Sequence, residues 1–434
     1  MAELIPFFIM IGLIIGFLLL GVPVLYTIGL VTGSIALFYW DLPLALMPIK
    51  LVEVGAWSYL ALPLFMLGGE LMTVMGITDT LIRFARSLVG YFRGGLSHVA
   101  VLTNVILAGL SGSAVADLAA VGPILIPGLT RAGYPKEYAT TICAVSALIG
   151  PLIPPSVPAI IYCLAVDASI GDLFLALVAP GLMVAGMCII VGYMTAVKKH
   201  FPRDAKFEFH QATKAFLPCI PAMFIPFVIV GGIRSGLFTP TEGGGVLVIV
   251  VALVGLFYHF TKLSRMRLPD VFEAMKRSAI VVSVVMSVVG ISYLFGHLVS
   301  LNQLGPKIAY LLTHVIKSKE IILFLIMVLI LILGCFLDLV PIILIFAPIL
   351  LPVVEKYGVD QIHFGCIMIF GSLIGMITPP YGLILLLSAK MSDVNPLLLF
   401  RTMFPFFIGM VLIFIMITFI PQISLFFPHL IRGQ

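Results

Sequence analysis

Apolar runs alternate with short polar connectors from one end of the 434-residue chain to the other. Each run is close to the ~20 residues with which a helix crosses a bilayer. Because lipid offers backbone groups no hydrogen-bond partner, these runs are expected to be helices. They predict an all-α integral membrane protein with about ten to twelve spans plus shorter broken segments. Clear examples are residues 5–20, 178–197, 246–260, 321–337 and 404–420.

The composition excludes an ordinary soluble domain. Hydrophobic residues make up 62% of the chain and charged residues 10%, whereas soluble domains carry about 25% charged residues. The mean hydropathy is +1.24. The first apolar run has no basic segment before it and no small-residue cleavage site after it. It is therefore expected to stay as a span and not to be removed as a signal peptide.

Catalytic and metal-binding motifs are missing from the sequence. The six cysteines lie singly inside apolar runs, so they are expected to be small buried hydrophobic residues. There is no Cys/His cluster, P-loop, GxSxG or metal-type HExxH motif. The sequence therefore predicts no enzyme activity and no cofactor. If the protein transports a solute, the missing ATP site means that an ion gradient would have to drive that transport.

Basic residues gather in two polar loops that are separated by two apolar spans. The two loops therefore face the same side of the membrane, and the positive-inside rule makes that side cytoplasmic. This role in topology explains the basic loops without any binding of nucleic acid. The first loop carries Lys198, Lys199, Arg203, Lys206 and Lys214, and the second carries Lys262, Arg265, Arg267, Lys276 and Arg277.

The first basic loop also divides the chain into two halves, residues 1–205 and 206–434. Two other polar stretches, 79–95 and 304–320, mix cations with apolar side chains. Each is interpreted either as a helix that lies along the lipid headgroups or as a short surface connector.

A repeated segment is the most informative feature of the sequence. Residues 123–155 and 348–380 align without a gap at an offset of 225 residues, and the prolines that interrupt the second copy all recur in the first. Broken apolar segments at matching places in two halves indicate the binding site of a secondary transporter.

The repeated prolines predict two broken helices. In the first half, four prolines fall within residues 150–158, and the pair Pro379–Pro380 breaks the second half at the matching place. Proline removes a hydrogen-bond donor and blocks the preceding turn, so no continuous helix crosses either segment. Carbonyls freed at such a break can hold a cation, and the N-terminus of the next half-helix can attract an anionic group. The alternative is a pair of kinks without function.

Small polar residues and two aspartates mark possible hairpin tips. Residues 109–117 interrupt an apolar run with Ser111-Gly112-Ser113 and Asp117. They predict a re-entrant hairpin with oxygen ligands at its tip, or alternatively close packing through small residues. Asp338 follows a long apolar run, and an intramembrane carboxylate usually marks an ion or substrate path. Asp338 could equally cap the next half-helix.

A third motif, residues 238–245, has a structural interpretation. Thr239 at the N-cap, Pro240 at the first helical position and Glu242 two residues later predict a capping box for the span that follows. Contact with substrate is the alternative.

These motifs, in this order, resemble the large membrane subunit of a tripartite ATP-independent periplasmic (TRAP) transporter over essentially the whole chain. The resemblance implies an elevator-type transporter built from two inverted repeats, in the bacterial inner membrane. It further implies hairpins near 99–130 and 321–354, and broken helices near 138–175 and 362–395. The motifs that carry it are residues 62–72, 110–117, 124–127, 153–158, 236–242 and 374–380.

The resemblance also implies sodium coupling, a small four-helix membrane partner and a periplasmic substrate-binding protein. Family substrates are mostly carboxylates, such as C4-dicarboxylates, sialic acids and sugar acids. The first sodium site would involve Ser111, Gly112, Ser113, Gly150 and Pro154, and the second Gly334, Asp338, Gly375 and Thr378. Substrate would lie between them, near Pro155, Ser156, Pro379 and Pro380.

The repeat departs from symmetry at the hairpin tips. At the 225-residue offset, Ser113 meets Asp338, whereas a shift of one turn would align Asp117 with Asp338 instead. Two other functions remain open from the sequence. One is a membrane enzyme with Asp117 and Asp338 as a catalytic pair, and the other is a passive channel or scaffold.

Overall fold

The computed structural model describes residues 9–10, 12–14, 16–17, 20–38, 48–49, 60–202, 208–264 and 266–432, and every regular element in these ranges is a helix. The predicted all-α fold is therefore confirmed. Six of these helices are long and apolar enough to cross a membrane, or up to eight if two bent pairs each count as one span. The predicted ten to twelve spans were counted over the whole chain, whereas several apolar runs in the described part form helices of 10–17 residues, which this count of six leaves out.

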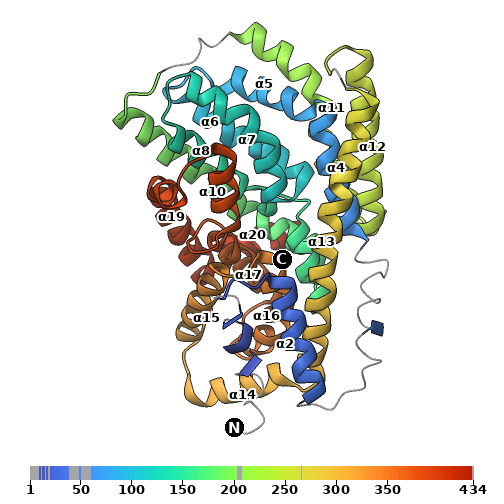
Figure 1. Ribbon diagram of the computed structural model, residues 1–434, viewed down its shortest axis with the longest axis vertical. Coiled ribbons are helices and arrows are strands. Elements are labelled where there is room, and N and C mark those ends of the chain that lie inside the picture. Colours follow the sequence, from blue (N-terminus) through green and yellow to red (C-terminus); the bar gives the residue numbers. More distant parts are fainter. Residues whose placement is uncertain are drawn as a thin grey trace.

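Two copies of one helix order make up most of the chain, and Figure 1 places α5 and α14, the first helices of the two copies, at opposite ends of the molecule. The copies are therefore inverted. The first contains α5 (Ile77–Val89), α6 (Gly95–Ser111), α7 (Ala114–Arg131), α8 (Lys136–Ala147), the short 3₁₀ helix η2 (Gly150–Leu152), α9 (Val157–Val166) and α10 (Ile170–Lys198). The second contains α14 (Leu304–Val315), α15 (Lys319–Gly334), α16 (Leu339–Glu355), α17 (Gln361–Gly375), α18 (Leu383–Ser392) and α19 (Pro396–Phe419).

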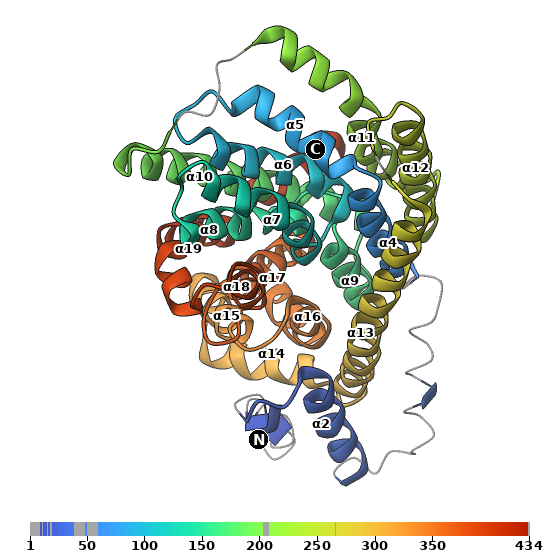
Figure 2. The ribbon, with the colours of Figure 1, turned by 45° about the horizontal axis from the view of Figure 1, so that its top comes forward.

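A separate group of helices runs along one side of the molecule, and we call it the arm (Figure 2). Within it, α4 packs against α12 and α13, while α2 packs against α13. Apart from α5 and α14, the helices of the two copies form what we call the bundle, which consists of α6–α10 and α15–α19. Helix α20 (Pro421–Arg432) packs against α10 of the bundle. The arm consists of α2 (Val24–Phe38), α4 (Ala61–Val74), α11 (Phe209–Arg234), α12 (Pro240–Phe260) and α13 (Leu268–Leu301).

The two basic loops lie at the same end of the molecule, as the sequence predicts. Antiparallel helices α11 and α12 connect them, and both loops contact the end that carries α5. Gly94 N donates to Pro202 O across 3.3 Å, and a Cβ on Gly76 would lie 2.8 Å from Ser264 Oγ. Arg203, Lys206 and Arg265 lie outside the described residues, as does the predicted boundary at residue 205.

Most of helix α5 comes from the first of the two polar stretches, residues 79–95, and its sequence is amphipathic. Its axis bends by 67° from that of α4. Ile77 and Leu81 are buried, whereas Asp79, Arg83 and Arg86 share an exposed face because they are spaced by about one turn. This is the pattern of a helix with one face toward the core and the other toward headgroups.

The capping box before α12 is confirmed. Thr239 N donates to Glu242 Oε2 at 2.7 Å, and Glu242 N donates to Thr239 Oγ1 at 3.3 Å. Pro240 stands at the first helical position. Five of the six cysteines are buried, and all six are free.

The two copies interlock inside the bundle. Helix α9 of the first copy packs against α16 of the second, and α18 of the second packs against α7 and α8 of the first. Tyr162 on α9 donates its hydroxyl to the Gln361 carbonyl oxygen on α17 at 2.7 Å. Both broken helices are therefore held by helices from the opposite copy.

Candidate functional site

A glycine turn forms the first hairpin tip. Helix α6 ends at Ser111, Gly112 adopts a left-handed conformation (φ +61°), and Ser113 caps α7 by accepting a hydrogen bond from Ala116 N at 3.4 Å. The predicted hairpin is thus present. Glycine is required at position 112 for a second reason, because a Cβ there would contact Pro155 O and lie 3.1 Å from Val157 N.

The first break separates α8 from α9 at the predicted prolines. The Pro154–Pro155 peptide bond is cis, as is the Pro379–Pro380 bond in the second copy. Ser156 is fully buried at the start of α9, where its Oγ accepts from Ala159 N at 3.3 Å and donates to Pro151 O at 2.5 Å. In this structure its hydroxyl therefore holds the two sides of the break together.

The first tip and the first break touch directly. Val157 N, at the start of α9, donates to the Gly112 carbonyl oxygen at the tip across 3.3 Å. A Cβ on Gly150 would lie 3.2 Å from the carbonyl carbon of Ser113 and from Asp117 Cγ. The residues predicted for a first sodium site thus meet at one place, which we call the first half-site: Ser111, Gly112, Ser113, Gly150 and Pro154.

Asp117 also belongs to the first half-site, although the sequence-based sodium set omits it. Its side chain is fully buried, and its Oδ1 accepts a hydrogen bond from Ser111 Oγ. Its Oδ2 has no partner in the described part of the chain. A buried carboxylate is costly unless it is paired or coordinates a cation. Asp117 follows Ser111 by six residues, and the two side chains touch only because the glycine turn at the tip reverses the direction of the chain.

The second hairpin tip carries a carboxylate where the first carries a hydroxyl. Asp338 is the N-cap residue of α16, just as Ser113 is of α7, so the 225-residue offset holds at the tip and no one-turn shift occurs. The Asp338 side chain makes no capping hydrogen bond to α16. Its Oδ1 is buried without a partner among the described residues.

The second break lies beside the second tip. Tyr381 N donates to the Cys335 carbonyl oxygen at 3.2 Å, which parallels the bond between Val157 and Gly112. Gly334, at the end of α15, packs so closely on α17 that a Cβ added to it would lie 2.9 Å from Gly375 Cα. Thr378 Oγ1 donates to Ile374 O at 2.7 Å. Gly334, Asp338, Gly375 and Thr378 therefore form a second half-site.

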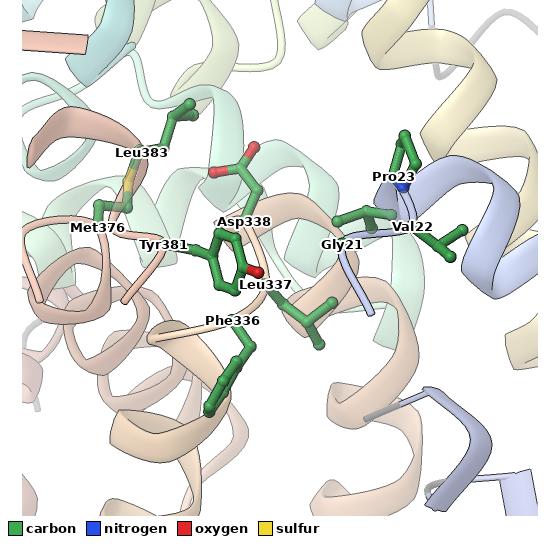
Figure 3. A pocket seen from close by; sticks show the side chains of 10 residues that line it. Gly21, Val22, Pro23, Phe336, Leu337, Asp338, Met376, Tyr381 and Leu383 are labelled. Carbon is green, nitrogen blue, oxygen red and sulfur yellow. The ribbon is translucent and has the colours of Figure 1, made fainter. Parts of the chain in front are cut away.

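A cavity of about 230 Å³ adjoins the second half-site (Figure 3). Its walls come from the second tip, the second break and the segment that precedes α2. No pattern in the sequence indicates the third wall, because that segment lies more than 300 residues from Asp338. The lining residues are Gly21, Val22, Pro23, Val24, Phe336, Leu337, Asp338, Met376, Tyr381 and Leu383. Pro379 and Pro380 precede Tyr381 directly, without lining the cavity themselves.

Comparison with known proteins identifies the family. Residues 11–423 match the model of the tripartite ATP-independent periplasmic transporter, DctM component. This chain belongs to the DctM family of TRAP transporters. It is 34% identical, over 96% of its length and 97% of the relative's, to the 2,3-diketo-L-gulonate TRAP transporter large permease protein YiaN of Escherichia coli. It is also 35% identical, over 88% of each protein, to the C4-dicarboxylate large permease protein DctM of Pseudomonas aeruginosa.

Another relative has a different substrate in its name. The sialic acid TRAP transporter large permease protein SiaM of Vibrio cholerae is 32% identical over 88% of each protein. Among solved structures, the Alcanivorax borkumensis YdaH transporter matches with a TM-score of 0.57 and 17% identity over 85% of each chain, which shows a shared fold. The DctM-family chain is thus a multi-pass protein of the bacterial inner membrane and a large permease component.

Proposed function

We propose that this DctM-family permease imports a carboxylate-bearing solute by sodium symport. The observation that carries the proposal is the duplicated contact between a hairpin tip and a broken helix. Each copy places at that contact a buried carboxylate oxygen that has no hydrogen-bond partner among the described residues, Asp117 Oδ2 in one and Asp338 Oδ1 in the other. Oxygen ligands and a negative charge are what a hard cation such as sodium requires.

Sodium at these two places explains why the carboxylates are tolerated. In the first half-site the ligands would be Asp117 with Ser111, Gly112, Ser113, Gly150 and Pro154. In the second they would be Asp338 with Gly334, Gly375 and Thr378. Each bound cation would offset one buried charge, so binding would stabilise the closed contact between tip and break.

The substrate would lie between the half-sites and move with the bundle. The arm packs against the bundle, chiefly through α13 on α16, and the breaks lie within the bundle, so an elevator motion would shift both half-sites against the arm. Pro155, Ser156, Pro379 and Pro380 would flank the substrate. The substrates in the relatives' names, C4-dicarboxylate, sialic acid and 2,3-diketo-L-gulonate, make an organic acid the expected class.

The tripartite family adds two partners to the proposal. A small four-helix membrane subunit would bind this chain, and a periplasmic binding protein would deliver the solute. The test is uptake of labelled organic acids by proteoliposomes that contain the permease and the small subunit, with the binding protein outside. Uptake should require an inward sodium gradient and the binding protein. Equal uptake with potassium alone, or linear flux without saturation, would contradict the proposal and favour a channel.

A further inference from the structure

The cavity beside the second half-site has mainly apolar walls and two polar side chains. Val22, Pro23, Leu337, Met376 and Leu383 supply the apolar surface. The polar groups are the Asp338 carboxylate, whose Oδ1 is buried without a partner, and the Tyr381 hydroxyl. Figure 3 shows both side chains at the wall of the cavity, between the break and the segment before α2.

This lining is unsuited to a carboxylate group. None of the ten lining residues is Arg, Lys or His. A carboxylate in the cavity would face the Asp338 charge with no cationic side chain among the described lining residues to offset it, and like charges in a partly buried site repel strongly. A sodium ion on Asp338 would balance that one charge, which still leaves no net positive charge for an acid.

Hydroxyl groups fit the same lining well. A hydroxyl can donate to the Asp338 carboxylate, which lines the cavity, and can exchange a hydrogen bond with the Tyr381 phenol. The carbon atoms of a sugar chain would then rest on the apolar walls. The volume, about 230 Å³, is below the ~300–1,000 Å³ of pockets that enclose a whole drug-sized ligand, so it suits one end of such a molecule.

We propose that this cavity binds the uncharged, hydroxyl-bearing end of the transported acid, so that the substrate is a hydroxylated monocarboxylate of the sugar-acid class and not a plain dicarboxylate. The inference rests on the proposed transport function. The carboxylate of the substrate lies outside the cavity. Tyr381 and Asp338 bind the hydroxyl end, and Val22 and Pro23 limit its size.

The wall formed by Val22 and Pro23 comes from the arm. These residues precede α2, which packs against α13, whereas Asp338 and Tyr381 belong to the bundle. The hydroxyl end is therefore bound between the two layers. A larger side chain at position 22 should reduce the room for it.

The test compares three six-carbon acids. D-gluconate has one carboxylate and five hydroxyls, hexanoate lacks the hydroxyls, and adipate lacks them too and carries a second carboxylate at its far end. Affinity is measured from the rise in unfolding temperature of the purified full chain with its small subunit, in sodium, as each acid is added. Gluconate should bind at least tenfold more tightly than adipate or hexanoate. Gluconate binding no tighter than adipate overturns the inference.

Variants test the individual contacts. Tyr381→Phe keeps the ring and removes the hydroxyl. It should weaken the binding of gluconate about three- to tenfold, which is the effect of one hydrogen bond, without changing the stabilisation by sodium alone. Val22→Phe should weaken the binding of gluconate at least tenfold. The control, Leu30→Phe, is on the exposed face of α2 and should have no effect. Unchanged gluconate affinity in both cavity variants overturns the inference.

The transport function can fail separately. If the reconstituted transporter takes up organic acids in response to sodium but the cavity variants bind gluconate normally, only the assignment of the cavity is wrong. If no acid is taken up in response to sodium, the proposed function itself is wrong.

Discussion

Gly150 is a residue of the first break that packs closely against the first tip. A Cβ there would meet the Asp117 carboxylate and lie 3.2 Å from the carbonyl carbon of Ser113. Gly150→Ala should therefore separate tip and break, cost about 1–3 kcal/mol of stability and abolish sodium-dependent uptake. Thermal unfolding and uptake measure the two effects.

The control for this substitution is Gly128→Ala in α7, where an added Cβ meets nothing within 4 Å. It should be neutral or stabilise the helix by up to about 1 kcal/mol. Normal sodium-dependent uptake by the Gly150→Ala variant would show that the tip–break contact has no part in transport.

Asp117 provides the charge of the first half-site. Asp117→Asn keeps the shape and an acceptor for Ser111 but removes the charge that a cation needs. The sodium concentration for half-maximal uptake should rise about tenfold or more. Asp79→Asn, on the exposed face of α5, is the control and should leave it unchanged. A sodium dependence identical in both variants would exclude Asp117 as a ligand.

For single residues, the sequence predicts which residues belong to the first tip and break better than it predicts which of them touch. Ser111, Gly112 and Gly150 stand out as small or helix-breaking residues in apolar surroundings. The bond from Ser111 to Asp117 depends on the left-handed turn at Gly112, whose direction the sequence does not specify. Nothing in the pattern around Val22 indicates that it lies near Asp338, because that contact depends on how distant helices pack.

The two hairpins are held in different ways. Helix α6 is joined to α8 by buried polar contacts, Asn104 Nδ2 to Ser146 Oγ at 2.7 Å and Tyr138 hydroxyl to Ser97 Oγ at 3.1 Å. Helix α15 is apolar from 321 to 333, and the counterpart of Asn104 at the 225-residue offset is Leu329. Between 321 and 333 the side chains of α15 therefore offer only apolar packing, so we expect the second hairpin to separate at lower cost than the first.

Asn104→Leu makes the first hairpin resemble the second at this position. It removes a buried hydrogen bond and should lower stability by about 1–3 kcal/mol, measured as a lower unfolding temperature. The first hairpin should also exchange its amide hydrogens faster, approaching the rate of α15. Thr402→Ala, at an exposed local hydrogen bond on α19, is the control and should change neither. An unchanged unfolding temperature would show that the hydrogen bond between Asn104 and Ser146 does not anchor α6.

The elements themselves were largely predictable. Proline and glycine define both breaks, and Thr239 to Glu242 define the start of α12 because a capping box is a local signal. The number of spans was not predictable from length and hydropathy alone. A run such as 321–337 is long enough to cross a bilayer, but α15 ends at Gly334 and the chain turns back.

At the scale of the whole molecule, an ion pair at the ends of two helices joins the bundle to the arm. Arg234 Nη1, at the end of α11, lies 3.3 Å from Asp172 Oδ1, in the first turn of α10. Both side chains are largely shielded, with 25% and 9% of their surfaces exposed. A shift of the bundle against the arm would break this pair, so it favours the arrangement of layers seen here.

The exchange Asp172→Arg with Arg234→Asp tests this role. Either single change should alter the rate of uptake two- to tenfold, as expected for the loss of about 1 kcal/mol in one state, and the double change should restore it. Uptake by the reconstituted transporter measures all three. A double variant no better than the singles would show that the pair does not link the layers.

Interlocking of the two copies means that neither copy completes its own interior. Helix α9 packs against α16, and α18 packs against α7 and α8, so a single copy would leave its broken helix without the helices that pack on it. A gene split between α10 and α11 should therefore yield an active transporter when both fragments are made together, and degraded fragments when either is made alone. Co-purification and uptake would show this. An ancestral single copy could have been stable only as a pair of oppositely oriented molecules, each completing the other.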